Sequence, residues 1–245
     1  MANYLLVHGA WGGAWYWRDT LATLIRAGHR AHAVTLTGLG ERAHLLNAQI
    51  DLETHIADVL GALDAEELTD CVLVVHSYAG MLGTAVADRR PGALRHLAYV
   101  DAVLPAPGET WGSRQSAEAR AQRISGAEAS AKYAFPAPPA SAFGLSGPLA
   151  DWVNRRQTPH PGHTYTQPLD FDPARVAAVP RTFISCTSPR LPTIEPSRQR
   201  LADPLFWDGR WTGGGGVQVI EMATGHDPML SEPEAFQRVL LKLGD

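Results

Sequence analysis

The sequence predicts a protein of the α/β class, with a mostly parallel sheet, helices on both faces and an inserted helical cap. Strand-like and helix-like segments alternate along residues 1–104, which is typical of such a sheet. The strand-like runs are nearly continuous in apolar residues, as strands buried on both faces are. This pattern stops after Leu104 and resumes at Arg181. A chain of 245 residues can form one such domain, with a core at 1–104 and 177–245 and a cap at 105–176.

The elements of the N-terminal part follow from the spacing of apolar residues. Buried runs of strand length predict strands at Tyr4–Val7, Ala31–Leu36, Cys71–Val75 and Leu94–Val100. Helical spacing predicts helices at Asp19–Ala27, Leu52–Leu63 and Met81–Arg89. Gly28 and Pro91 stand where the first and third of these helices would end.

The middle of the chain has a different composition. Residues 105–180 are rich in Pro, Ala, Ser and Gly and contain no strand-like run, but Ser116–Ser125 has helical spacing. A structureless loop of this length is improbable inside a compact domain, so we expect a helical cap. Regular elements are expected again at Arg181–Cys186 (strand), Val217–Met222 (strand) and Pro233–Leu243 (helix).

Composition excludes several classes of partner. Lys and Arg total 21 and Asp and Glu 25, a net charge of −4, so no basic surface for nucleic acid or anionic lipid is expected. Cys71 and Cys186 lie in apolar runs, which argues against a disulfide framework or a cysteine metal site. No apolar run reaches the length of a membrane span, and the first strand follows no signal peptide. We expect a cytoplasmic protein with no metal or organic cofactor and leave homo-oligomerisation open.

The main chemical motif is the segment VVHSYAG at residues 74–80, where a buried strand turns at once into a helix. A serine at such a turn is held at the carboxyl end of the sheet, beside backbone N–H groups of the helix N-terminus. Ser77 is therefore a candidate nucleophile. The segment departs from the usual G-x-S-x-G pattern at Val75 and Ala79. The alternative is a serine that caps the helix without reacting.

Two further segments support a reactive serine. His226 follows the last predicted strand, where it can reach over the strand ends to Ser77. Leu6–Trp11 ends the first strand in a glycine turn, and this resembles the turn of α/β-hydrolases that carries an oxyanion donor. The backbone N–H groups of Ala10 and Tyr78 would then hold the oxyanion.

Over nearly its whole length the chain resembles α/β-hydrolases related to plant hydroxynitrile lyases and methyl-ester esterases. His8–Trp11, Thr35–Arg42 and Tyr99–Ala102 look most like bacterial esterases that hydrolyse bulky xenobiotic esters such as pyrethroids and carbendazim. The resemblance implies an α/β-hydrolase fold and a carboxylesterase-type serine hydrolase. Such an enzyme cleaves an ester or carbamate through an acyl-enzyme, with Ser77 as nucleophile and His226 as base.

Two residue positions test whether the chain could be a hydroxynitrile lyase instead. Hydroxynitrile lyases of this family carry a threonine in the first turn and a lysine directly after the catalytic histidine. The matching positions here are Gly9 and Asp227, which leave cyanide without a cation. The alternatives to an esterase are a different cofactor-independent lyase or cyclase, or a catalytically silent small-molecule receptor.

The third member of the triad has two candidates. Relatives usually carry an aspartate just after the strand that matches Arg181–Cys186, but residues 187–192 contain no acid. Asp101 ends the preceding strand, and Glu195 lies in the following segment between Pro192 and Pro196. Both fit the chain order serine, acid, histidine. We favour Asp101, because a strand end is better fixed than a loop.

Aromatic residues are frequent in the predicted cap, namely Trp111, Tyr133, Phe135, Phe143, Trp152 and Tyr165. Most are expected to form the core of the cap. Trp11, beside the oxyanion turn, and Trp111 and Trp152 are the candidates to line a substrate pocket. Such a pocket would favour a small-molecule ester with an apolar or aromatic acyl or alcohol group.

Overall fold

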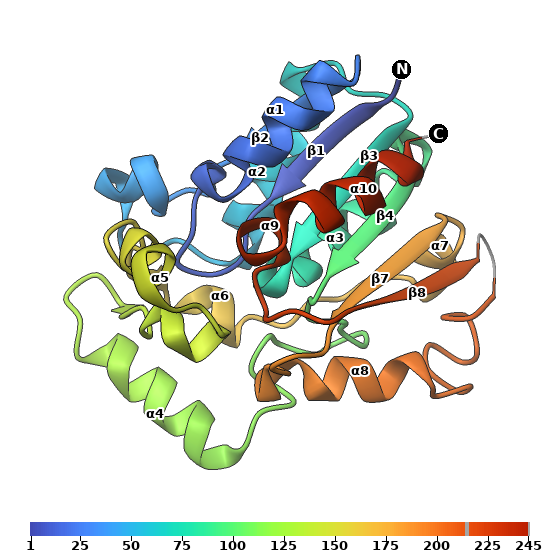
Figure 1. Ribbon diagram of the computed structural model, residues 1–245. Helices are drawn as coiled ribbons and strands as arrows, with labels where there is room; N and C mark the ends of the chain where they lie inside the picture. Colours follow the sequence, from blue (N-terminus) through green and yellow to red (C-terminus); the bar gives the residue numbers. More distant parts are fainter. Residues whose placement is uncertain (214–215, 245) are drawn as a thin grey trace.

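The computed structural model describes residues 1–213 and 216–244 and is built on a six-stranded sheet of order β2-β1-β3-β4-β7-β8 (Figure 1). Every neighbouring pair in this sheet is parallel. The strands are β1 Asn3–Val7, β2 Arg30–Val34, β3 Cys71–His76, β4 Leu94–Val100, β7 Arg181–Cys186 and β8 Val217–Met222. The predicted parallel sheet is confirmed, and the strand ends differ from the predicted ones by a few residues at most.

Alternate residues of the central strands pack on opposite faces of the sheet. On β3, Leu73 and Val75 belong to one apolar cluster, whereas Val72 and Val74 belong to the other. Every residue of β3 is buried, which requires cover on both faces. This explains why the strand reads as a continuous apolar run rather than as an alternating one.

Helices cover both faces, as predicted. The four that flank the sheet are α1 Arg18–Arg26, α2 Leu52–Ala65, α3 Gly80–Arg89 and α10 Pro233–Leu243. The helices α1 and α10 pack together on one face, in front of the sheet in Figure 1, and α2 and α3 pack together behind it. Among residues 1–213 and 216–244, no helix combines the length and the apolarity needed to cross a lipid bilayer.

Most of the segment between β4 and β7 forms short helices beyond one end of the sheet, whereas its last helix, α7, lies beside the sheet (Figure 1). Its elements are α4 Ala117–Glu128, β5 Ala134–Phe135, α5 Gly147–Asn154, β6 His160–Pro161, α6 His163–Thr166 and α7 Pro173–Ala177. The antiparallel pair of β5 and β6 was not predicted, because two-residue strands leave no apolar run to detect. The extent of the cap, 105–176, stays a prediction, since α7 already packs against α3 of the core.

One predicted loop is a helix. Glu195 was expected on a loop between two prolines, but it begins helix α8, Glu195–Leu201. Pro196 stands in the first turn of this helix, where its missing N–H has no intrahelical partner to lose. Pro196 is therefore compatible with the start of the helix rather than a barrier to it.

Candidate active site

Ser77 lies in the sharp turn between β3 and α3, at the start of the short 3-10 helix η3, Ser77–Ala79. Its φ of +57° is in the left-handed region, which a residue with a side chain rarely adopts. Glycines make room for this turn: a Cβ on Gly9 would lie 2.7 Å from the Cβ of Ser77, and one on Gly80 would collide with the carbonyl oxygen of Val103. The turn is therefore built to hold Ser77 against the end of β1.

Val75, which departs from the usual glycine of the pattern, is accommodated by a glycine in helix α3. Gly83 of α3 faces Val75, and a Cβ on Gly83 would lie 2.8 Å from both γ-carbons of Val75. The absent side chain of Gly83 provides the space that a glycine at residue 75 would otherwise give. Strand and helix thus still cross closely behind Ser77.

Ser77, His226 and Asp101 form a continuous hydrogen-bonded chain. His226 Nε2 lies 2.9 Å from Ser77 Oγ, and His226 Nδ1 lies 2.8 Å from Asp101 Oδ2. His226 and Asp101 are buried, and Ser77 is half-buried. Because the carboxylate can only accept, Nδ1 carries the proton and Nε2 is free to accept from the serine hydroxyl.

The end of β4 holds Asp101 firmly. Its backbone N–H donates to the carbonyl of Ile184 at 2.8 Å, and its Oδ1 accepts from the N–H of Cys186 at 3.2 Å. Both partners lie on β7, the strand after which relatives carry their acid. The carboxylate of Asp101 therefore reaches the neighbourhood of that missing acid from the adjacent strand.

The structure does not bring Glu195, the other candidate acid, to His226. Within the described residues, its carboxylate lies 3.3 Å from Arg198 Nη1 and 3.8 Å from Arg190 Nη1. Its side chain is 40% exposed, whereas that of Asp101 is fully buried. The helical start at Glu195 directs the carboxylate toward these arginines and solvent.

Arg198 is a residue of this site that sequence reasoning missed. Its Nη2 donates to Asp101 Oδ1 at 2.7 Å and to the carbonyl of Cys186 at 3.0 Å. The pair is almost completely buried, so the arginine supplies the charge that a buried carboxylate needs. No local signal could have revealed it, because the two residues are distant in the sequence.

A second histidine and acid lie behind His226. His76 Nε2 donates to the backbone carbonyl of His226 at 3.0 Å and lies 3.4 Å from Asp227 Oδ1. Burial lowers the pKa of His76 well below its usual range and raises the pKa of Asp227 to about 6. These three side chains are close enough to share a metal ion, but both ring nitrogens of His226 are already hydrogen-bonded. The cluster therefore does not fit a metal site.

The turn that carries Ala10 is held from the segment between β4 and β7. Trp11, directly after Ala10, has a φ of +62°. Its N–H donates to His160 Nδ1 at 3.3 Å, and its carbonyl accepts from the N–H of Thr158 at 3.0 Å. Gly9, directly before Ala10, lies against Ser77, so this turn contacts the serine. The two predicted oxyanion donors, Ala10 and Tyr78, are the residues that follow Gly9 and Ser77 in the chain.

Two of the three tryptophans predicted to bind substrate lie together beside this turn. The rings of Trp11 and Trp111 are 6.0 Å apart, and Trp111 lies 4.8 Å from the ring of Tyr78. Trp152 instead packs on Trp15 at 5.0 Å and belongs to a different cluster, so the structure does not bring it to Trp111. The other rings of the Trp11–Trp111 cluster are Phe135, Phe143, His160 and Tyr165.

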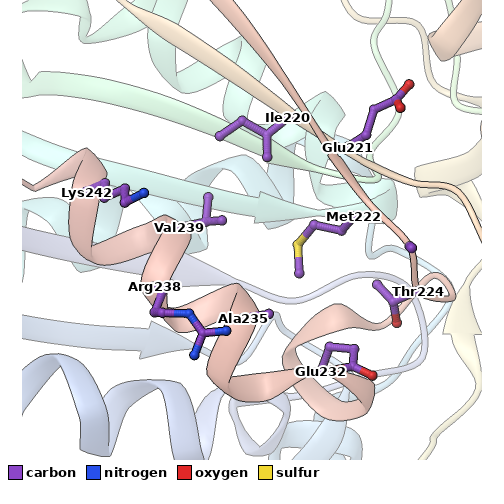
Figure 2. A pocket seen from close by; sticks show the side chains of 10 residues that line it. Ile220, Glu221, Met222, Thr224, Glu232, Ala235, Arg238, Val239 and Lys242 are labelled. Atoms are coloured by element: carbon purple, nitrogen blue, oxygen red, sulfur yellow. The ribbon is translucent and has the colours of Figure 1, made fainter.

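A surface groove of about 550 Å³ lies between β8 and α10 (Figure 2). Ile220 and Met222 of β8 face Val239 and Ala235 of α10 across it. Its lining contains none of Ser77, His226 and Asp101. This groove is therefore separate from the hydrogen-bonded chain of the candidate site.

Fold and site together define a hydrolase of the α/β class, and the comparisons with known proteins agree. The model of the Alpha/beta hydrolase family matches residues 4–239, so the chain belongs to that family. The expected fold and family resemblance are confirmed. The chain is 41% identical over 252 residues to the carbendazim hydrolyzing esterase of Nocardioides sp. (strain SG-4G), and the match covers 100% of both chains.

More distant relatives cover the whole chain as well. Methylesterase 7 of Arabidopsis thaliana is 24% identical, over 99% of this chain and 96% of the relative. An extracellular α/β-hydrolase from a Paenibacillus species has the same fold, with a TM-score of 0.82 at 20% identity over 100% and 99% of the two chains. A pyrethroid hydrolase from Sphingobium faniae JZ-2 also has this fold, with a TM-score of 0.70 at 19% identity; the match covers 100% of this chain and 97% of that chain. The expectation of a carboxylesterase-type enzyme is confirmed at the level of the family.

Proposed function

We propose that the protein is a serine esterase that hydrolyses a carboxylic ester or carbamate with a bulky aromatic group through an acyl-enzyme. The observation that carries the proposal is the continuous contact from Asp101 through His226 to Ser77, which lies in a turn with a strained backbone. A serine that merely capped a helix would need neither the buried histidine nor the buried acid.

The chemistry follows from this arrangement. Ser77 Oγ attacks the carbonyl carbon while its proton passes to His226 Nε2, and the carbonyl oxygen becomes an oxyanion. The N–H groups of Ala10 and Tyr78 would hold that oxyanion. Asp101 keeps the proton on Nδ1 and stabilises the imidazolium.

The second half of the reaction restores the enzyme. His226 gives its proton to the departing alkoxide or amine, which leaves Ser77 esterified. A water molecule then attacks the acyl carbon as His226 accepts its proton, and the acid leaves as the serine takes the proton back. Every proton that moves is carried by His226, so no metal or organic cofactor takes part in these steps.

The substrate class rests on the ring cluster around Trp11 and Trp111. These rings lie beside the two proposed oxyanion donors, where one side of a bound ester would lie. The 41% identical relative, which aligns over its full length, is named for hydrolysing carbendazim. This relationship favours an aromatic ester or carbamate over a short aliphatic one.

Turnover of p-nitrophenyl acetate and of aromatic methyl carbamates tests the proposal directly. We expect hydrolysis by the wild-type chain and a loss on the order of 10⁶ in turnover for Ser77→Ala. An organophosphonate should label Ser77 and no other residue, as mass spectrometry of peptides can determine. Binding without turnover would instead indicate a receptor, and labelling elsewhere would contradict the assignment of the nucleophile.

A further inference from the structure

Arg123 of α4 projects into the aromatic cluster beside the candidate site. Its guanidinium carbon lies 5.0 Å from the ring centres of both Trp11 and Phe135. It lies 5.9 Å from those of Trp111 and Tyr165. A cation at these distances is attracted to the ring faces, so the four rings hold the side chain in place.

Among the described residues, no carboxylate pairs with this cation. Within the described part of the chain, the side chain of Arg123 forms no hydrogen bond and no ion pair, although it carries several N–H donors. The side chain is half-buried, and this burial lowers its pKa below the usual value for arginine. The acids of the same helix, Glu118 and Glu128, are exposed. The rings offset part of the cost of desolvation, and the N–H donors of this half-buried side chain stay accessible to solvent or to a bound acceptor.

A groove of about 390 Å³ opens beside Arg123. Its residues are Gln115, Ala119, Gln122, Arg123, Gly126, Phe135, Pro136 and Thr193. None of them is acidic, so Arg123 is the charged group of this lining. Gln122 and Thr193 add neutral hydrogen-bonding groups. A groove with this lining suits an acceptor that is planar, negatively charged and attached to an apolar group.

The same rings connect the groove to the candidate nucleophile. Trp11 follows Ala10 directly, and Trp111 packs on the ring of Tyr78, which follows Ser77. Arg123 contacts both tryptophans. The charge therefore lies on the side of the site where the aromatic part of an ester is proposed to bind.

We propose that Arg123 and this groove bind a carboxylate borne on the aromatic ring of the substrate, so that the preferred substrates are aromatic monoesters with a free carboxylate. A guanidinium and a carboxylate match in shape and can form two parallel charge-assisted hydrogen bonds. The flanking rings would stack on the aryl group. This inference rests on the proposed esterase function, and it adds which aromatic esters are selected.

A matched pair of esters tests the selection. Monomethyl terephthalate carries the free carboxylate, and dimethyl terephthalate is its neutral counterpart. We expect Arg123→Met to lower kcat/KM for the monoester by about tenfold or more, the effect of losing a charge-assisted hydrogen bond, and to change the diester less than about threefold. Arg120→Met, an exposed change on the same helix, is the control and should alter neither. Equal losses on both esters, or none on either, would overturn the proposal.

A binding measurement separates this inference from the esterase proposal. Calorimetric titration of the Ser77→Ala chain with benzoate and with benzamide compares an aryl carboxylate with its neutral analogue without any turnover. We expect benzoate to bind more tightly, with the preference abolished by Arg123→Met and kept in part by Arg123→Lys. If benzoate showed no preference while the wild-type chain hydrolysed neutral esters, the inference about Arg123 alone would be wrong. If benzoate bound as expected but no ester were hydrolysed, the esterase proposal alone would fail.

Discussion

The guanidinium of Arg198 lies 2.7 Å from Oδ1 of Asp101, so the carboxylate that faces His226 with one oxygen is paired with an arginine through the other. Arg198 comes from α8, and Asp101 comes from the end of β4. The pairing neutralises a fully buried charge and aims the second oxygen at the histidine. Helix α8 is thereby part of the support of the candidate site.

Removal of Arg198 should destabilise the whole chain. Arg198→Met leaves the buried charge of Asp101 without its arginine, and breaking a buried ion pair in this way typically costs about 3–5 kcal/mol. Arg190→Met is the matched control, because the Arg190 side chain is 54% exposed and pairs loosely with Glu195; it should cost less than about 1 kcal/mol. Urea unfolding monitored by circular dichroism measures both. A stability of Arg198→Met equal to that of the wild type would mean that the buried pair contributes nothing.

Amide substitution distinguishes the two acids considered from the sequence. Asp101→Asn should lower turnover of p-nitrophenyl acetate by at least about 10²-fold, because the amide no longer holds the proton on Nδ1 of His226. Glu195→Gln should lower it less than about tenfold, as expected for an exposed charge paired with arginine. Circular dichroism spectra would show that both variants are folded. The reverse order of the two losses would assign the role to Glu195.

The sequence predicts those parts of the site that depend on local pattern. A serine after a buried strand and a histidine after the last strand can be recognised because each motif is continuous in the chain. Arg198 could not be predicted, since it lies on α8 and its partner Asp101 follows β4, and only the folded chain brings the two side chains together. Likewise, the side chain of Val75 fits between strand and helix only because residue 83 is a glycine, and Gly83 lies outside the motif around Ser77.

The predicted binding tryptophans show the same limit. Composition suggests a pocket but does not say which rings meet. The chain after β4 folds back so that Trp111 contacts Trp11. Trp152 lies on α5 and packs on Trp15 instead. Their separation is a property of tertiary packing alone.

The two tryptophans should therefore respond differently to truncation. Trp111→Ala should lower kcat/KM for a bulky aromatic ester much more than for p-nitrophenyl acetate, since burial of an aromatic ring contributes roughly 1.5–3 kcal/mol of binding. Trp152→Ala should affect both esters alike and act mainly on stability, because its ring contacts Trp15 and Arg156. Comparison of kcat/KM for the two esters provides the measurement. An equal loss on both esters for Trp111→Ala would indicate a purely structural role.

Acid should unfold the chain through its buried histidines. Burial lowers the pKa of both His8 and His55 from 6.5 to about 4. Because the folded state resists protonation, their full stabilisation is present above pH 6.5 and is lost as the pH falls toward 4, roughly 3 kcal/mol for each group.

The free energy of unfolding at pH 7, 6 and 5 measures this loss. The variant His55→Gln removes one titrating group and keeps a donor for the carbonyl of Thr37, so its stability should fall less steeply with pH than that of the wild type. His44→Gln is the exposed control and should leave the slope unchanged. A wild-type stability that stays constant between pH 7 and 5 would contradict the assignment.

The contact between His160 and Trp11 leads to a prediction about the oxyanion turn. His160 accepts from the N–H of Trp11, the residue after the proposed donor Ala10, and its other ring nitrogen lies 2.9 Å from Thr164 Oγ1. Burial lowers the pKa of His160 well below its usual range, so Nδ1 stays free to accept at neutral pH. We infer that His160 is a positioning residue that keeps the turn at Ala10 and Trp11 in place.

His160→Leu removes the acceptor, and His160→Asn restores one, because Oδ1 of asparagine occupies nearly the position of Nδ1. Loss of one oxyanion donor costs about 10²–10³ in turnover, and a displaced turn should lose part of this, so we expect His160→Leu to lower kcat for p-nitrophenyl acetate by about tenfold. KM should change little, since the donors act mainly on the transition state. His160→Asn should recover most of the rate, and exposed His163→Asn should have no effect. A merely structural role would lower the stability of both His160 variants without this difference in kcat, since only the acceptor at the δ position separates them.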